Sequence, residues 1–153
     1  IKSLAKINDL QDPNSKMSKS AASMAGVIEL LDSPEATIKK FKSSVTDAGK
    51  EIKYDEKEKP GISNLLTIHS AFSGKSVKEI ENEFAGKGYG DFKLQVAEVV
   101  VEALNPIRVK TQELMDDKGE LIKILKSGAE KANQVAGKTL SDVYTALGLI
   151  NNG

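Results

Sequence analysis

The stretch Lys16-Met17-Ser18-Lys19-Ser20 divides the sequence into two parts with different patterns of apolar residues. Before it, the spacing of Leu4, Ile7 and Leu10 is typical of the end of a buried strand. Pro13-Asn14-Ser15 then predicts a turn. After it, apolar residues recur at helical spacing through most of the chain. The sequence therefore predicts a mainly α-helical protein that follows a short strand-like segment and a lysine- and serine-rich loop.

Several helix-start and helix-stop signals lie within the helical part. Ser33 followed by Pro34 is a typical start, and Ser76 with Glu79 has the pattern of a capping box. Gly148 is expected to end the last helix, because glycine readily adopts the backbone conformation that closes a helix. The stretches predicted to carry a helical apolar stripe are 24–31, 38–45, 62–72, 77–84, 92–107, 121–125 and 132–147.

Three features predict interruptions. Residues 46–59 are polar and lack a clear period, so they predict an irregular segment. Pro106 lacks a backbone donor and its ring clashes with the carbonyl of Glu102, so a kink or break is expected there. Ser127-Gly128 is expected to separate a short helix from the final one. Asp91 is the expected cap of the long helix before Pro106.

The bulk composition limits the classes of function. The 153 residues include 22 Lys and Arg and 22 Asp and Glu, which argues against bulk attraction to nucleic acid or anionic membrane but not against a local basic site. The absence of Cys excludes disulfides and thiolate metal sites and suits a reducing, cytoplasmic location. No apolar run is long enough to span a membrane. The single histidine, His69, lies on an apolar stripe and is expected to be structural.

Residues 16–20, which we name the lysine–serine loop, carry groups suited to an anion with several oxygens. Lys16 and Lys19 are three positions apart, so a tight loop would let their ammonium groups converge. Ser18 and Ser20 add hydroxyl donors, and the helix expected next would add unpaired amides. A polyphosphate that gains charge during a reaction is the natural ligand. An ordinary solvated loop, with Ser20 as a helix cap, is the alternative interpretation.

The loop sequence Lys-Met-Ser-Lys-Ser is identical to the second signature of class I aminoacyl-tRNA synthetases. Further blocks resemble bacterial tryptophanyl-tRNA synthetases and occur in that family's order. The chain is therefore similar to the carboxyl-terminal half of this family, over nearly its whole length. The related tyrosyl enzymes share the loop, but the blocks 61–66 and 86–90 favour the tryptophanyl ones. The blocks are 10–13, 45–47, 54–55, 59–66, 86–90, 92–93 and 128–132.

The resemblance implies a reaction and a set of site residues. Tryptophan and ATP would give tryptophanyl-adenylate and pyrophosphate, after which the aminoacyl group passes to tRNA. Lys16 and Lys19 match the catalytic lysines that stabilise the departing pyrophosphate. Mg²⁺ normally accompanies the ATP, and no protein ligand for the metal is expected in this chain. The residues expected to contact ATP are Ile7, Lys16, Met17, Ser18, Lys19 and Ser20.

The resemblance also implies a domain organisation and partners. Residues 1–20 match the end of a Rossmann-type nucleotide-binding domain, and residues 21–153 match a helical domain with the anticodon-binding region. The expected partners are tRNA(Trp), ATP, tryptophan and a second copy of the parent protein, paired through the half not present. No membrane partner is expected.

Two departures from the family pattern set the expected activity. Ala21 stands where the family often has Asp. The family's first signature, which contains two histidines, and the tryptophan pocket are missing from this sequence. We therefore expect one half of an active site, inactive by itself. The alternative from another class is a free-standing helical adaptor or RNA-binding module that retains the loop as a relic.

Overall fold

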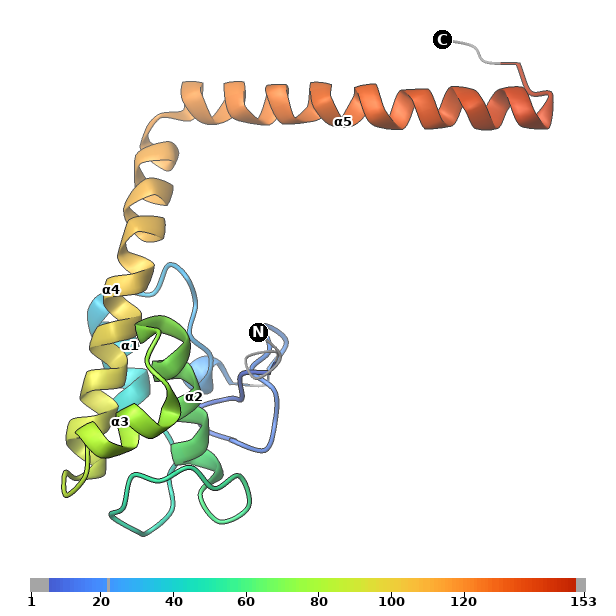
Figure 1. The fold of residues 1–153 in the computed structure, drawn as a ribbon. Helices are drawn as coiled ribbons and strands as arrows, with labels where there is room; N and C mark the ends of the chain where they lie inside the picture. The colour runs from blue at the N-terminus through green and yellow to red at the C-terminus, as the bar shows by residue number, and fades with distance from the viewer. Residues whose placement is uncertain (1–5, 22, 151–153) are drawn as a thin grey trace. The chain divides into compact units, whose positions relative to one another are not determined.

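The computed structural model describes residues 6–21 and 23–150 of the chain. Within these residues the only β-structure is an isolated bridge, and the rest is helix and irregular segments (Figure 1). The prediction of a mainly helical protein is confirmed. The helices are the 3-10 helix η2 (Met24–Gly26) and the α-helices α1 (Pro34–Lys42), α2 (Pro60–Ser73), α3 (Val77–Glu83), α4 (Tyr89–Asp116) and α5 (Lys118–Leu147).

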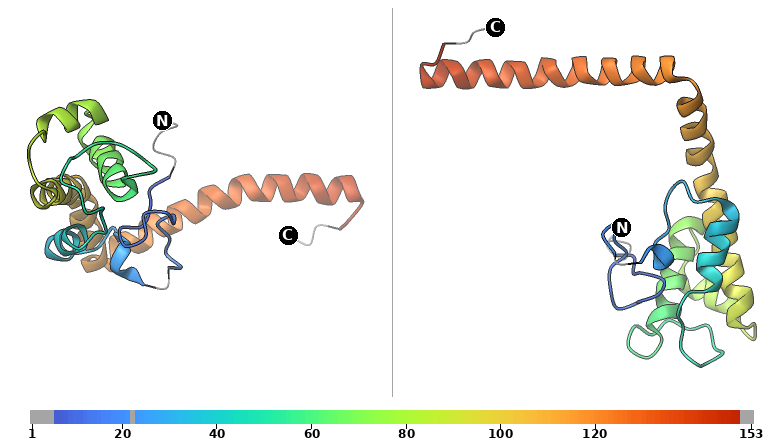
Figure 2. Two further views of the ribbon diagram at one scale, coloured as in Figure 1. Left: turned by 90° about the horizontal axis from the view of Figure 1, so that it is seen from below. Right: turned by 180° about the vertical axis from the view of Figure 1, so that it is seen from behind.

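The chain forms two compact units, Ile1–Arg108 and Val109–Gly153. In the first unit, α1, α2 and α3 pack against the amino-terminal half of α4 (Figure 2). Their core is aliphatic with two phenylalanines from α1 and α4 and a third just after α3. Its most deeply buried members are Phe41, Ile62, Leu65, Leu66, Ile80, Phe92 and Val96.

Local signals account for the ends of α1, α2 and α3. The Ser33 hydroxyl accepts a hydrogen bond from the Ala36 N–H at 3.2 Å, and Pro34 occupies the first helical position. Gly74 ends α2 with a φ of 73°, a conformation that is strained for other residues. Ser76 and Glu79 form the predicted capping box, with the Glu79 carboxylate accepting from the Ser76 N–H at 2.7 Å.

His69 is a core residue, as predicted from its place on an apolar stripe. Its side chain is 3% exposed, and its ring lies 6.1 Å from the Phe84 ring and 6.2 Å from the Phe92 ring. Its Nδ1 is 3.2 Å from the Ser73 hydroxyl. Burial lowers the pKa of His69 below its ordinary value, because the low-dielectric core disfavours the charged ring.

The helix predicted over residues 24–31 is wrong. Only Met24–Gly26 is helical, as a single 3-10 turn, and Val27 is extended, with φ −109° and ψ 125°. Tertiary contacts explain the difference. The Gly26 carbonyl accepts a hydrogen bond from the Leu10 N–H at 2.9 Å, and a Cβ on Gly26 would lie 1.6 Å from the Asp9 carboxylate. This close packing on residues 9–10 holds the segment in a non-helical path.

The break expected at Pro106 and the separation expected at Ser127-Gly128 are also wrong, whereas a kink at Pro106 stays a prediction. Helix α4 continues through Pro106, because a single missing donor frees only the Glu102 carbonyl, which water can satisfy at this exposed position. Helix α5 continues through Ser127-Gly128, since one interior glycine costs about 1 kcal/mol, too little to end a helix of 30 residues. Asp91 is not the cap of α4 but lies in its first turn.

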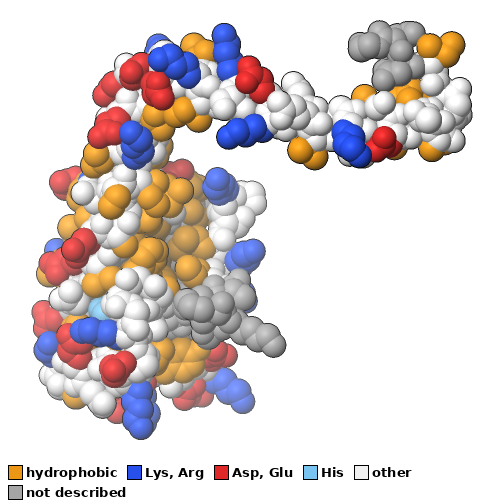
Figure 3. All heavy atoms as spheres, turned by 45° about the horizontal axis from the view of Figure 1, so that its top comes forward, with side chains coloured by type: hydrophobic (Ala, Val, Ile, Leu, Met, Phe, Trp, Pro, Cys, Tyr) orange, Lys and Arg blue, Asp and Glu red, His pale blue; other side chains and the backbone are white. Residues whose placement is uncertain are grey.

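The second unit contains the end of α4 and all of α5. Asp117 caps α5 by accepting from the Glu120 N–H at 3.0 Å, and Gly148 ends it with a φ of 68°, as predicted. Helix α5 buries none of its residues, and both apolar and charged side chains are exposed along it (Figure 3). None of the described helices has the length and apolar content needed to cross a membrane.

Candidate functional site

The lysine–serine loop begins from a narrow paired segment, residues 7–17, which we name the loop stem. Asn8 and Lys16 form an antiparallel bridge, and the Met17 N–H donates to the Ile7 carbonyl at 3.0 Å. On the other side of the bridge, the Asp9 N–H donates to the Ser15 carbonyl at 2.9 Å. The stem thus sets the position and direction from which Lys16 starts.

The turn at the end of the stem is closed by two aspartates. The Asp9 carboxylate accepts hydrogen bonds from the N–H groups of Gln11 at 2.7 Å and Asp12 at 3.2 Å. Asp12 in turn accepts from the Ser15 hydroxyl at 2.5 Å. Asp9 is 8% exposed, so its charge is satisfied locally by backbone donors. The predicted turn around Pro13 is therefore present and tightly bonded.

Hydrogen bonds and a buried side chain attach the stem to the helical core. Asn64 of α2 accepts from the Asn8 N–H at 3.0 Å and donates to the Asn8 carbonyl at 2.9 Å. The Leu10 carbonyl accepts from the Val45 N–H at 2.7 Å, and the Leu10 side chain is buried in the core. The stem is therefore part of the first unit and moves with it.

The lysine–serine loop itself forms a turn rather than a helix start. The Ala21 N–H donates to the Ser18 carbonyl at 3.1 Å, and the hydroxyls of Ser18 and Ser20 lie 2.9 Å apart. Because no α-helix follows directly, the expected helix dipole and row of unpaired amides are not available at this loop. Any anion bound here would depend on side chains and on the turn's own amides.

Five of the six residues predicted to contact ATP line one open hollow, of about 340 Å³. Ser20 does not line it, but its hydroxyl contacts that of Ser18. Val27 and Ile28 complete the wall, so the hollow combines ammonium groups and a hydroxyl with an apolar surface. The lining residues are Ile7, Lys16, Met17, Ser18, Lys19, Val27 and Ile28.

Reasoning from sequence missed Val27 and Ile28 as members of this site. Their helical spacing predicts a helix face, whereas Val27 is extended and buried. Two β-branched residues directly after Gly26 were an available signal, since such residues favour extended backbone. A neighbouring hollow of about 420 Å³ shares Lys19 and both of these residues and continues along residues 29–32.

Both lysines of the loop are exposed to solvent. Within residues 6–21 and 23–150, neither Lys16 nor Lys19 forms an ion pair, whereas Lys40 and Lys59 are paired with aspartates. Their charges are thus not neutralised by any described side chain. A strongly anionic ligand could engage them without first breaking an internal pair.

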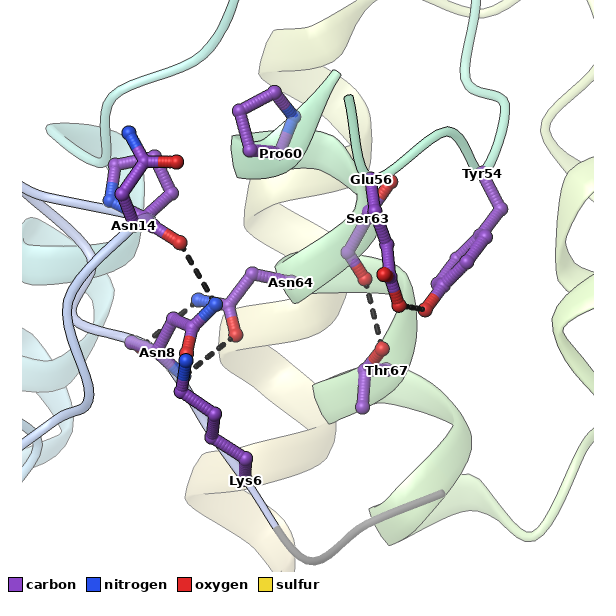
Figure 4. Close-up of a pocket in the computed structure, with 10 residues that line it drawn as sticks. Lys6, Asn8, Asn14, Tyr54, Glu56, Pro60, Ser63, Asn64 and Thr67 are labelled. Carbon is purple, nitrogen blue, oxygen red and sulfur yellow. Dashed lines mark hydrogen bonds between the residues drawn. The ribbon is translucent and has the colours of Figure 1, made fainter. Parts of the chain in front are cut away.

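A second, more polar hollow of about 320 Å³ lies where the stem meets α2 (Figure 4). Tyr54 donates to Glu56 at 2.5 Å on one side, and Asn8 donates to the Pro13 carbonyl at 2.7 Å on the other. None of residues 16–20 lines it. Among the described residues that line it, Lys6 is the only basic one, and the buried Asn64 also belongs to its wall. We assign this hollow no catalytic group.

Metal-binding potential is limited in the part of the chain that the structure describes. No group of three or more His, Asp or Glu side chains there is arranged to hold a metal ion. The first hollow is lined by cationic, hydroxyl and apolar groups, a set that does not ligate a hard cation directly. A metal ion at this site would have to be carried by an anionic ligand.

Comparison with known proteins identifies the family. The sequence model of the family described as class I tRNA synthetases (W and Y) matches residues 3–105. The chain is 52% identical over 150 residues to tryptophan–tRNA ligase 2 of Streptomyces avermitilis, covering 98% of this chain and 44% of that protein. It is 53% identical over 145 residues to the tryptophan–tRNA ligase of Bacillus anthracis, covering 95% and 44%.

Solved structures agree. The tryptophanyl-tRNA synthetase of Mycoplasma pneumoniae superposes with a TM-score of 0.82 at 32% identity, over 99% of this chain and 47% of that one. The Campylobacter jejuni enzyme, complexed with ADP and tryptophan, gives 0.67 at 30% identity, over 92% and 44%. The chain thus spans less than half the length of these relatives. From the family match and this level of identity, the chain belongs to the class I tRNA synthetases of the tryptophan and tyrosine group.

Proposed function

We propose that this chain is the carboxyl-terminal part of a tryptophan–tRNA ligase and contributes the lysine–serine loop to its active site. The parent protein would join tryptophan to ATP, releasing pyrophosphate, and then transfer the aminoacyl group to tRNA(Trp). The names of its relatives support this assignment. The observation that carries it is the shared hollow, which Lys16, Ser18 and Lys19 line together with an apolar wall.

ATP fits this set of groups as a substrate. Its triphosphate matches two unneutralised ammonium groups and a hydroxyl, and the apolar wall of Ile7 and Val27 suits contact with the less polar part of a nucleotide. The tryptophan carboxylate attacks the α-phosphorus, and the bond to the β-phosphate breaks with its electron pair on the leaving pyrophosphate. Lys16 and Lys19 would neutralise charge that is greatest as this bond breaks, so they would favour the transition state over bound ATP.

Mg²⁺ belongs to the proposal through ATP. Because the hollow presents cations and hydroxyls rather than carboxylates, the ion would be held by phosphate oxygens and water. Its contribution would be to neutralise phosphate charge alongside the two lysines. No residue of this chain is proposed as its ligand.

The remaining assignments follow from the same proposal. Residues 1–20 would be the end of the Rossmann-type nucleotide-binding domain, and residues 21–153 a helical domain that supports tRNA and includes the anticodon-binding region. The tryptophan pocket and the surface that pairs two copies would lie in the other part of the ligase. The reaction partners are cytoplasmic, so we expect the parent protein in the cytoplasm.

A chimaera tests the proposed function. The amino-terminal part of the Streptomyces avermitilis relative would be joined to residues 1–153, and tryptophan-dependent pyrophosphate exchange measured. We expect activity, and we expect Lys16→Ala and Lys19→Ala each to lower it by roughly a hundredfold or more with tryptophan affinity little changed. Lys78→Ala, on the exposed side of α3, is the matched control. Full activity in both loop variants would overturn the proposal and favour the helical adaptor.

A further inference from the structure

We infer that Asn64 is a positioning residue, which fixes the start of the lysine–serine loop against helix α2. Its carboxamide accepts the Asn8 N–H at 3.0 Å and donates to the Asn8 carbonyl at 2.9 Å. It therefore bonds both backbone groups of one residue, as a neighbouring strand would. Its effect on catalysis rests on the proposed function, whereas its effect on the loop stem does not.

The contact at Asn8 is one step from the catalytic lysine. Asn8 is the bridge partner of Lys16, and the adjacent hydrogen bond joins the Met17 N–H to the Ile7 carbonyl. The order outward from α2 is therefore the Asn64 side chain, the stem segment that contains Asn8 and the stem segment that contains Lys16. A shift of Asn8 would be transmitted directly to the backbone of Lys16.

Among side chains as short as that of asparagine, only a carboxamide makes both of these hydrogen bonds. An aspartate offers acceptors but no donor for the Asn8 carbonyl, and an aliphatic side chain offers neither. Asn64 is 7% exposed, so an unpaired group here would be separated from water. The residue type at position 64 is therefore explained by the backbone that it faces.

Helix α2 is a rigid support for this contact. Ile62, Leu65 and Leu66 are at most 1% exposed, which places the flanking positions of the helix in the core. Next to Asn64, the Ser63 hydroxyl accepts from the Asp55 N–H at 2.8 Å. Gly61 lies so close to Val45 that an added Cβ would be 2.2 Å from its carbonyl oxygen. Contacts within about one helical turn thus attach the loop stem and two points of the segment between α1 and α2 to the start of α2.

The loop tip is held differently from the stem. The described hydrogen bonds of Ser18, Ser20 and Ala21 all lie within the turn itself. Beyond Met17, the backbone has no described hydrogen bond to α2 or the core until residue 26. Asn64 therefore marks the boundary between a fixed stem, which sets the origin of Lys16, and a tip able to adjust to a ligand.

Amide hydrogen exchange on this chain tests the structural half of the inference. With Asn64→Ala we expect the amides of Asn8 and Met17 to exchange about tenfold faster, because one linked set of hydrogen bonds is lost. The Leu10 amide, bonded to Gly26, should change little. Asn64→Asp should keep the Asn8 amide bond and regain protection at Met17 at low pH, when the introduced carboxyl can donate.

A control separates local loosening from a general loss of stability. Ile80→Val removes one methyl group from the same core without touching the stem, so it should speed the exchange of all core amides alike. Uniform acceleration in Asn64→Ala, matching that in Ile80→Val, would overturn the inference. Unchanged exchange at Met17 would overturn it as well.

The chimaera tests the catalytic half. We expect Asn64→Ala to lower kcat of pyrophosphate exchange about tenfold to a hundredfold, with KM for tryptophan within about twofold, because the lysine is displaced rather than removed. Asn64→Asp should recover part of kcat, and Asn82→Ala, at an exposed position of α3, should match the unsubstituted chimaera. A normal kcat in Asn64→Ala, in a chimaera where Lys16→Ala is impaired, overturns the positioning role alone. If Lys16→Ala itself shows no loss of kcat, the result counts against the proposed function instead.

Discussion

The hydroxyl of Tyr89 lies 2.9 Å from the carboxylate of Asp47, although 42 positions separate them in the sequence. The Lys59 ammonium group donates to the same hydroxyl at 3.0 Å and lies 3.3 Å from the same carboxylate. Burial raises the pKa of Asp47, but the hydrogen bonds from Tyr89, the Gly49 N–H and Lys59 outweigh it, and the pKa lies below its ordinary value. This cluster holds the irregular segment 46–59 against the start of α4.

Tyr89→Phe should therefore destabilise the first unit. The substitution keeps the ring and removes the one group that joins Asp47, Lys59 and the Glu51 carbonyl. We expect a loss of about 1–2 kcal/mol in the free energy of unfolding, measured by urea denaturation. Tyr54→Phe is the control, because Tyr54 is exposed and its hydroxyl donates to the exposed Glu56 rather than to this cluster, and it should cost less than about 0.5 kcal/mol. Equal losses in the two variants would contradict this role of the cluster.

Substitution by alanine should have opposite effects on stability at two glycines that occupy equivalent helix positions. Gly61 and Gly90 are each the second residue of their helix, α2 and α4. A Cβ at Gly61 would lie 2.2 Å from the Val45 carbonyl oxygen, whereas a Cβ at Gly90 would meet nothing within 4 Å. Gly61→Ala should cost about 1–3 kcal/mol, and Gly90→Ala should be neutral or stabilise by up to about 1 kcal/mol. Thermal unfolding followed by circular dichroism measures both, and a stable Gly61→Ala would show that the helix start can shift.

The stability of the chain should fall as the pH drops through the range in which histidine titrates. Burial lowers the pKa of His69, with a further contribution from Lys75 that the Glu83 carboxylate opposes. The unfolded chain then takes up a proton at a higher pH than the folded chain, so stability is complete above about pH 7.5 and declines below about pH 6.5. The free energy of unfolding should change by at most about 1.4 kcal/mol per pH unit, and this change should stop below the pKa of His69 in the folded protein.

The variant His69→Gln provides the comparison for this pH dependence. It cannot titrate, so its free energy of unfolding should be flatter between about pH 7.5 and 5.5, even if its overall stability is lower. Urea denaturation at several pH values measures both slopes. Parallel slopes in the two proteins would assign the pH dependence to the carboxylates instead.

The chain by itself should make no tryptophanyl-adenylate. It has a single histidine, buried in the core, and it corresponds to 44% of the length of its Streptomyces avermitilis relative. Pyrophosphate exchange by the purified chain should therefore stay at background. Under the same conditions, with ATP and tryptophan present, the chimaera should show exchange. Clear exchange by the chain alone would contradict the proposal that it holds only part of the site.

Helix ends that depend on neighbours in sequence were predictable. The caps at Ser33 and Ser76 and the glycine end at Gly148 all lie where the sequence placed them. Capping is a contact between residues two to five positions apart, so the information is local. The irregular segment 46–59 was also predictable from local sequence, because its residues are polar and lack a clear period of apolar positions.

The site was predictable only in part. The lysine–serine loop and Ile7 were identified from residue types and a family resemblance, and five of the six predicted ATP contacts share one hollow. Val27 and Asn64 were missed as parts of the site or its support. Each acts through a partner far away in sequence, and for Asn64 that partner is a backbone that any residue could provide.

By itself, the sequence determined the helical class, several helix ends, the core position of His69 and the groups available to bind a polyphosphate. Only the tertiary structure decided that residues 24–31 leave the helical path, and that α2 rather than a following helix supports the loop. The reason is physical. Periodicity and capping are set within a few residues, whereas the Gly26–Leu10 and Asn64–Asn8 contacts form only when distant segments meet, and their energy then overrides the local helical preference.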